Sequence, residues 1–298
     1  MSLVSAIIVS YKNEDMTCKY VNEELKKCPE VDHIVIVNNA ATELSNKRLL
    51  ENIPCSEISS GEEYHGAKVI ILHNINNQGF ACGNNQGAIF VDRFIHSKYL
   101  LFSNDDIIIT DKNVISRLIK RRMRDNSIGC FAPKILRPNG DVQGPYEYWS
   151  LWKRYAMYTI YPIGMKWAQY FITNRRKNLS RQIVSGFYNT LVGCFFMIEL
   201  SDFISIGMMD KRTFLYREEE ILAERLKYKG KHNYCETSVS VVHLGGKSSF
   251  KECKRQYNFV NQTVRDSDII YYHYYMKYPL WQIHLAQNIQ HWVCTILT

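Results

Sequence analysis

The first 40 residues restrict the fold most, because they hold two apolar runs separated by a short amphipathic segment. Residues 4–10, Val-Ser-Ala-Ile-Ile-Val-Ser, form a nearly continuous apolar run rich in β-branched residues, which is typical of a strand covered on both faces. The amphipathic segment ends before Pro29, and a second apolar run covers 33–37. Strand, helix and strand in this order predict a βαβ unit. Its parallel sheet would place a ligand at the carboxyl ends of the strands. Those ends are Ser10-Tyr11-Lys12 and Asn38-Asn39.

Two adjacent carboxylates, Asp105 and Asp106, stand between the apolar runs of residues 100–109. At the end of a buried strand they would repel each other and lose hydration unless a positive charge met them. Mg²⁺ or Mn²⁺ suits carboxylate oxygens and keeps positions open for phosphates, so the pattern favours a nucleotide-diphosphate site. The alternative is a turn or a helix N-cap that happens to carry two aspartates.

A glycine-containing turn follows a third predicted strand at residues 69–72. Glycine permits a tight backbone here, and Asn84 is expected to cap the next helix. A helix start of this kind suits phosphate or sugar hydroxyls, although a plain turn is the commoner explanation. The candidate ligand-binding residues of this turn are Asn77, Gly79, Phe80 and Asn84.

A cluster of three glutamates and a single histidine are the candidate residues of the second half of the chain. Glu218, Glu219 and Glu220 begin a predicted helix, where acidic residues also interact favourably with the helix dipole. His243 ends a predicted strand over residues 239–242 and precedes two glycines.

Two aromatic regions differ from the rest of the chain. Residues 145–182 interleave aromatic and basic side chains, which predicts an insertion that faces an acceptor or a membrane, or else a loop packed on the domain. Residues 247–298 predict a helical extension that packs on the domain, associates with itself or lies on lipid. The expected organisation is a catalytic domain over 1–246 followed by this extension.

Charge and cysteine content restrict the partners and the compartment. The net charge of +8 favours an anionic partner. Nine cysteines without a C-x-x-C pair fit a reducing cytoplasm. No apolar stretch reaches the roughly 18 residues of a spanning helix, so we expect a soluble protein, with peripheral contact at the inner face of a membrane as a further expectation. Nucleic-acid binding is disfavoured, because basic residues form no continuous aromatic-interleaved face outside 145–182.

The motifs and their order resemble family 2 glycosyltransferases, most closely the bacterial rhamnosyltransferase-type enzymes that build surface polysaccharides. The resemblance covers residues 4–248. It rests on Ala6-Ile-Ile-Val-Ser-Tyr, Val35-Ile-Val-Asn-Asn-Ala, Asn77-Gln-Gly-Phe-Ala-Cys-Gly-Asn-Asn-Gln-Gly, Leu101-Phe-Ser-Asn-Asp-Asp-Ile, Ala132-Pro-Lys-Ile-Leu-Arg-Pro-Asn-Gly, Phe214-Leu-Tyr-Arg-Glu-Glu-Glu and His243-Leu-Gly-Gly-Lys-Ser.

This resemblance implies an α/β GT-A fold, with a Rossmann-like mixed sheet flanked by helices, and inverting transfer from a nucleotide-diphosphate sugar. Asn104, Asp105 and Asp106 match the family's DXD-type motif, in which the final aspartate binds Mg²⁺ or Mn²⁺. His243 matches a histidine near that metal. Glu218 and Glu219 match the Glu-Asp pair that holds the catalytic base. Ser10, Tyr11 and Asn38 match the nucleobase pocket.

Two departures from the family pattern leave questions open. Asn38 replaces an aspartate, so the preferred base is undetermined. Glu219 replaces an aspartate, so the base is either Glu218 or Glu219. The expected donor is of the dTDP-rhamnose or UDP-hexose class, and the expected acceptor is a saccharide or a lipid-linked saccharide.

Two alternative functions belong to other classes. Nucleotidyltransferases that make activated sugars share an open α/β sheet, but they carry a glycine-rich basic loop after the first strand, where this chain has Lys12-Asn13-Glu14-Asp15. A catalytically impaired module that binds nucleotide sugars is the non-enzymatic alternative, which Asn38 and the triple glutamate motivate.

Overall fold

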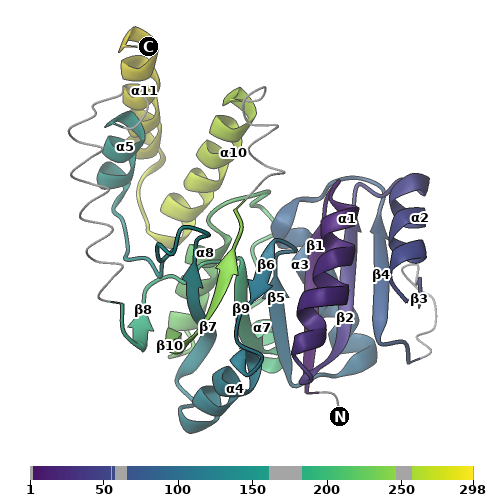
Figure 1. Ribbon diagram of the computed structural model, residues 1–298. Coiled ribbons are helices and arrows are strands. Elements are labelled where there is room, and N and C mark those ends of the chain that lie inside the picture. Colours follow the sequence, from purple (N-terminus) through teal and green to yellow (C-terminus); the bar gives the residue numbers. More distant parts are fainter. Residues whose placement is uncertain (1–2, 55, 58–65, 161–182, 246–256, 298) are drawn as a thin grey trace.

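One mixed β-sheet with helices on both faces forms the body of the molecule (Figure 1). The computed structural model describes residues 3–54, 56–57, 66–160, 183–245 and 257–297. The central strands follow the order β3-β4-β2-β1-β5-β9-β7-β10-β6, and β8 pairs with β10. Their bounds are β1 Val4–Ser10, β2 Val31–Asn39, β3 Ser56–Glu57, β4 Val69–Asn74, β5 Tyr99–Ser103, β6 Ile107–Ile109, β7 Ile128–Leu136, β8 Gly186–Tyr188, β9 Phe195–Glu199 and β10 His232–His243.

The parallel half of the sheet confirms the predicted βαβ unit. β1 pairs in parallel with β2 and with β5, and β2 pairs in parallel with β4. Successive side chains of β1 pack on opposite faces of the sheet. Ala6 and Ile8 belong to one buried cluster, and Ile7 belongs to the cluster on the other face. The apolar run of β1 is therefore continuous because both faces are covered.

The helix expected after the glycine-containing turn starts earlier in the chain than its predicted cap. α3 begins at Gly79, so Asn84 lies inside the helix, where its side chain donates to the Phe80 carbonyl at 3.0 Å. The prediction that Asn84 caps this helix is wrong. The helices of the sheet layers are α1 Glu14–Lys19, continued by η1 Tyr20–Glu24 and η2 Leu25–Lys27, α2 Glu43–Asn52, α3 Gly79–Phe90, continued by η3 Val91–Ile95, α4 Val114–Arg124, α7 Leu200–Ser205 and α8 Glu218–Lys227.

A helical unit, formed by α5 and the C-terminal helices, stands beside the sheet (Figure 1). It consists of α5 (Leu151–Ile160), α10 (Tyr257–Ile269), η4 (Ile270–Tyr275) and α11 (Leu280–Leu297). Its core includes Tyr155, Tyr272 and Ile283 and reaches the body of the molecule through Ile221 of α8. The first part of the aromatic 145–182 region thus packs with the C-terminal helices. Residues 161–182 lie outside the described part.

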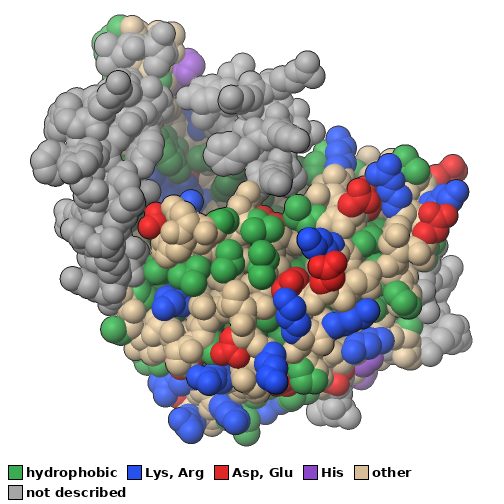
Figure 2. Space-filling model, in the orientation of Figure 1, with side chains coloured by type: hydrophobic (Ala, Val, Ile, Leu, Met, Phe, Trp, Pro, Cys, Tyr) green, Lys and Arg blue, Asp and Glu red, His purple; other side chains and the backbone are tan. Residues whose placement is uncertain are grey.

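Lys and Arg side chains gather at the lower edge of the molecule, over α4 (Figure 2). The last turn of α4 carries Arg121, Arg122 and Arg124, where cations complement the helix dipole. Arg122 is buried and pairs with Glu199 at 2.6 Å, so it serves the fold. Among the described residues, no helix is both long and apolar enough to cross a bilayer.

Candidate active site

The pairing of β10 with β6 brings Asp106 and His243 together. These strands run antiparallel with His243 opposite Ile107, the residue after Asp106. The Leu244 amide donates to the Asp106 carbonyl at 2.9 Å, and His243 Nε2 lies 3.2 Å from Asp106 Oδ1. Two residues that are 137 positions apart in the chain therefore meet at the end of one strand pair.

Gln143 fixes the orientation of the His243 ring. Its Oε1 lies 2.9 Å from His243 Nδ1 and accepts the proton on that nitrogen. In the neutral ring, the lone pair of Nε2 then faces Asp106 Oδ1, a buried oxygen without a hydrogen-bond partner in the described structure. Two lone-pair atoms at this distance repel unless a cation or a proton lies with them. A carboxylate oxygen and an imidazole nitrogen in this arrangement fit a divalent metal.

The described residues supply only part of a coordination sphere. Among them, no group of three or more His, Cys, Asp or Glu side chains is arranged to hold a metal ion. A divalent ion at Asp106 and His243 would need further ligands from phosphate oxygens or water, as is usual for Mg²⁺ sites that act on nucleotides.

Asp105 points away from its neighbour and secures the start of α1. Its Oδ2 accepts from Thr17 Oγ1 at 2.7 Å and from Asn13 Nδ2 at 3.1 Å. Burial raises its pKa to about 6, with a contribution from the charge of Asp106. The adjacent aspartates therefore have different environments, and the oxygen without a hydrogen bond belongs to Asp106.

The three glutamates at the start of α8 also differ in environment. Glu220 Oε1 accepts from Arg154 at 2.9 Å and from Arg217 at 3.2 Å; burial opposes its ionisation, but the two cations hold its pKa below the ordinary value. Burial raises the pKa of Glu218 well above its ordinary value, and its Oε1 lacks a partner in the described structure. Burial raises the pKa of Glu219 to about 7, with the charge of Glu220 adding to the rise.

The side chain of Glu219 packs directly against the backbone of Gly193. A Cβ atom at this position would lie 2.0 Å from Glu219 Oε1, so only glycine leaves room for the carboxylate. The next residue, Cys194, accepts a hydrogen bond at its carbonyl from the Asn104 amide at 2.8 Å. Burial raises the pKa of the Cys194 thiol, and the charges of Asp106 and Glu219 add to the rise. The entry to β9 thus joins the aspartate motif to the glutamate motif.

The predicted nucleobase residues lie at the carboxyl ends of β1 and β2. Ser10 is fully buried and its Oγ lies 2.8 Å from Thr17 Oγ1. Tyr11 is partly exposed, with Lys12 Nζ 5.1 Å from its ring centre. Asn38 is buried and donates its amide hydrogens to Ser45 and Asn46. The amide hydrogens of Asn38 are therefore engaged at the start of α2.

The turn before α3 supports the loop that leads to the glutamates. Asn77 Oδ1 accepts from Asn39 and from the Gly79 amide. The Phe80 amide donates to the Phe214 carbonyl at 2.8 Å, and a Cβ on Gly79, whose φ is +83°, would lie 2.3 Å from that same oxygen. Gly79 and Phe80 therefore position the loop before Glu218.

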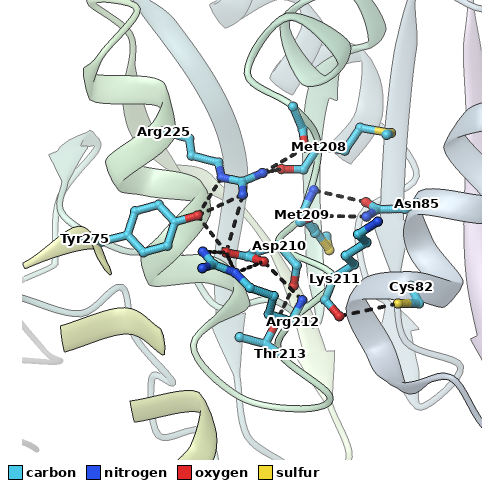
Figure 3. A network of polar contacts seen from close by, with 11 residues as sticks. Cys82, Asn85, Met208, Met209, Asp210, Lys211, Arg212, Thr213, Arg225 and Tyr275 are labelled. Carbon is cyan, nitrogen blue, oxygen red and sulfur yellow. Dashed lines mark hydrogen bonds and ion pairs between the residues drawn. The ribbon is translucent and has the colours of Figure 1, made fainter. Parts of the chain in front are cut away.

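A polar network holds the same loop at its other end (Figure 3). The side chain of Asn85, from α3, exchanges two hydrogen bonds with the backbone of Met209. Despite burial, bonds from Arg212 and Tyr275 lower the pKa of Asp210 to about 2. Arg225 of α8 donates to Tyr275, which belongs to η4. The loop is thus tied to the sheet layer and to the helical unit.

The helical unit also buries Arg217, the charged residue directly before the three glutamates. Arg217 has a φ of +73°, and its Nε lies 2.5 Å from the fully buried Asp268 Oδ1. The other oxygen of Asp268 accepts from Tyr155 at 2.8 Å, and Arg217 also contacts the hydroxyl of Tyr158. α5 and α10 therefore fix the N-terminus of α8.

Sequence reasoning missed three residues of this site. Gln143 lies in an irregular segment whose sequence gives no periodic signal, and Arg217 pairs with a residue 51 positions away. Gly193 did carry a signal, because an isolated glycine within a strand pattern often marks a close approach of another group.

Comparison with solved structures identifies the fold. A structure of GalNAc-T7 with UDP, GalNAc and Mn²⁺ matches with a TM-score of 0.59 and 14% identity, over 90% of this chain and 48% of that chain. The mannosyltransferase PcManGT from Pyrobaculum calidifontis, in complex with GDP-Man and Mn²⁺, matches with a TM-score of 0.55 and 10% identity, over 99% of this chain and 73% of that one.

The chain has the GT-A glycosyltransferase fold, as the motif order predicts. It spans about half the length of the GalNAc-T7 chain. No protein-family model and no curated protein sequence matches it.

Proposed function

We propose that the protein is an inverting glycosyltransferase that uses a nucleotide-diphosphate sugar and a divalent metal. The observation that carries the proposal is the convergence of two separate acidic motifs. Asp106 and His243 meet at the end of β10, and the Asn104–Cys194 hydrogen bond links the same region to Gly193, on which Glu219 rests.

Asp106 and His243 are the residues that would hold Mg²⁺ or Mn²⁺. Bound there, the cation would neutralise the negative charge that develops on the departing diphosphate. The chain contributes the orientation of this pair, because Gln143 holds the His243 ring and the β6–β10 register holds the Asp106 backbone.

Glu219 is the general base of the proposed reaction. A base must take the proton of the acceptor hydroxyl as its oxygen attacks the anomeric carbon from the face opposite the diphosphate, and the configuration inverts. A pKa of about 7 lets Glu219 both accept and release a proton near neutral pH. Glu220 is ion-paired and Glu218 is more deeply buried, so Glu219 is the best suited of the three.

For specificity, we propose a family 2 enzyme with a donor of the dTDP-rhamnose or UDP-hexose class and a saccharide or lipid-linked acceptor in surface polysaccharide synthesis. The motif order is the support for this assignment. Ser10, Tyr11 and Asn38 are the proposed base-side residues, and Asn77, Gly79, Phe80, Asn104 and Asp105 are proposed to shape the donor site.

We also propose a cytoplasmic location with peripheral contact at the inner face of a membrane. The outer side of α11 carries a stripe of exposed apolar residues at helical spacing, which suits an interfacial helix. The stripe consists of Trp281, Leu285, Ile289, Trp292 and Ile296. Sedimentation with anionic vesicles should be lost in the double variant W281S/W292S and retained in I75S, where an exposed apolar residue lies outside α11. Equal sedimentation of both variants would contradict this contact.

A screen of UDP-, dTDP- and GDP-sugars with Mn²⁺ and Mg²⁺ tests the enzymatic proposal. Slow hydrolysis of one nucleotide sugar, lost in E219Q while nucleotide binding survives, is the expected result. Tight binding without hydrolysis or transfer would instead indicate the impaired binding module.

A further inference from the structure

A cavity of about 150 Å³ lies on the flank of the molecule, between β8, the start of β10 and the second half of α8. None of its lining residues belongs to the candidate catalytic set. It is lined by Glu147, Phe187, Tyr188, Asn189, Ala223, Lys227, His232 and Asn233.

Asn233, one of the residues that line this cavity, also holds a buried hydrogen-bond acceptor that is not used. Its side chain is 5% exposed, and its Nδ2 donates to the Asn189 carbonyl at 3.0 Å. Its Oδ1 has no hydrogen-bond partner in the described structure. A buried acceptor left unpaired is unfavourable, but this oxygen has almost no accessible surface, so a ligand hydroxyl in the cavity would reach it only after the Asn233 side chain turns.

One wall of the cavity is a firmly held aromatic ring. Phe187 is 49% exposed, although its ring makes edge contacts with His232 and Tyr234 at centroid distances of 5.9 and 5.4 Å. A fixed and half-exposed ring of this kind offers an apolar surface for the C–H groups of a sugar. Aromatic residues are well suited to such contacts because they lose little conformational entropy.

The charges around the cavity favour a neutral ligand. Lys227 Nζ lies 2.7 Å from Glu224 Oε1, so its positive charge is offset. Glu147 adds a carboxylate, which accepts from Asn189 at 2.8 Å through Oε2. Without an excess of positive charge the cavity is poorly suited to a phosphate, whereas amide and carboxylate oxygens beside an aromatic ring suit a polyhydroxylated ring.

The two residues that α8 contributes to the cavity, Ala223 and Lys227, lie on the face of α8 that carries Glu219. Glu219, Ala223 and Lys227 are spaced by four residues, which places them on one side of the helix at intervals of about 6 Å. A smaller void of about 10 Å³, lined among others by Glu219, Leu222 and Asn233, adjoins the same asparagine. The cavity thus lies one to two helical turns from the proposed base.

We propose that this cavity binds a neutral pyranose ring of the acceptor saccharide, at a sugar unit that does not react. The assignment to the acceptor rests on the proposed function, whereas the sugar-binding property stands on the cavity alone. A short oligosaccharide can then occupy the cavity with one unit and present a hydroxyl near Glu219 with another.

The first experiment titrates methyl glycosides of rhamnose, glucose, galactose, mannose and N-acetylglucosamine, without donor, by saturation-transfer NMR. We expect at least one to bind in the millimolar range, with tenfold or greater weakening in F187A and in E147Q. Y228A is the matched control, because Tyr228 is 74% exposed at the same end of α8 but outside the cavity. Absence of binding to the wild type, or equal binding to all variants, would overturn the proposal.

A second measurement separates this proposal from the proposed function. UDP and GDP are titrated with Mn²⁺ on the same samples, and F187A should bind them as the wild type does. If no nucleotide binds any sample, the glycosyltransferase proposal fails, while the glycoside titration still decides the sugar site. Once an acceptor is identified, F187A should raise the KM for that acceptor and leave kcat unchanged. An unchanged KM would overturn the acceptor assignment.

Discussion

Replacing Glu219 with glutamine should stabilise the fold while it abolishes transfer. Burial, aided by the charge of Glu220, raises the pKa of Glu219 from 4.5 to about 7. A rise of this size corresponds to at most about 3.4 kcal/mol of unfavourable free energy in the ionised state. Because water reaches part of the side chain, we expect a gain of about 1–2 kcal/mol in the glutamine variant at high pH.

The sign of the effect follows from linkage between protonation and folding. The folded state holds its proton more tightly than the unfolded state, so ionisation of Glu219 lowers wild-type stability as the pH rises from about 4.5 to about 7. Glutamine does not ionise. Urea unfolding at pH 8 should therefore show a larger free energy of unfolding for E219Q than for the wild type, and the difference should shrink at pH 5.

Glu220, the next residue, provides a control in which the glutamine substitution should change stability in the opposite direction. Arg217 and Arg154 overcome the effect of burial and hold the pKa of Glu220 below its ordinary value, so E220Q should be destabilised at pH 8. An E219Q variant that is less stable than the wild type at pH 8 would refute the argument that ionisation of Glu219 lowers the stability of the folded protein.

Three further predictions concern the support of the site. Gly79→Ala should destabilise the protein by about 1–3 kcal/mol more than Gly140→Ala in thermal unfolding, because both glycines have positive φ but only Gly79 faces a backbone oxygen at 2.3 Å from the new Cβ. Equal losses would contradict this. Gln143→Leu should weaken Mn²⁺ binding about tenfold in a metal titration with nucleotide, since it frees the His243 ring; unchanged affinity would count against it. Transfer should rise with pH up to about 7, where Glu219 ionises, and a flat profile would exclude it as the base.

The strands of the parallel sheet were predictable because a strand that is buried on both faces consists of a continuous run of apolar residues, which is visible in the sequence. β1 begins and ends where the apolar run does, at Val4 and Ser10. The aspartate motif was predictable for the same reason, since β5 and β6 are apolar runs on either side of Asp105 and Asp106. The start of α3 was not, because it depends on the Phe80 amide bond to the distant Phe214 carbonyl as well as on the local bond from the Gly79 amide to Asn77.

The environments of the acidic residues depend on contacts that sequence spacing does not encode. Adjacent aspartates separate into one that fixes α1 and one that faces His243, according to the strand register. Adjacent glutamates separate because Arg154, from the aromatic region, reaches Glu220 and leaves Glu219 against Gly193. Family resemblance indicates which motifs matter, but only the folded chain distinguishes their members.

Calorimetric titration of UDP and GDP into the wild type and the variant D106N, each with and without Mn²⁺, tests the central claim most directly. The convergence of Asp106 and His243 predicts that a nucleoside diphosphate binds the wild type only with Mn²⁺, and that D106N removes this dependence together with the binding. Equal affinity in both proteins, with or without the metal, would contradict the proposed site.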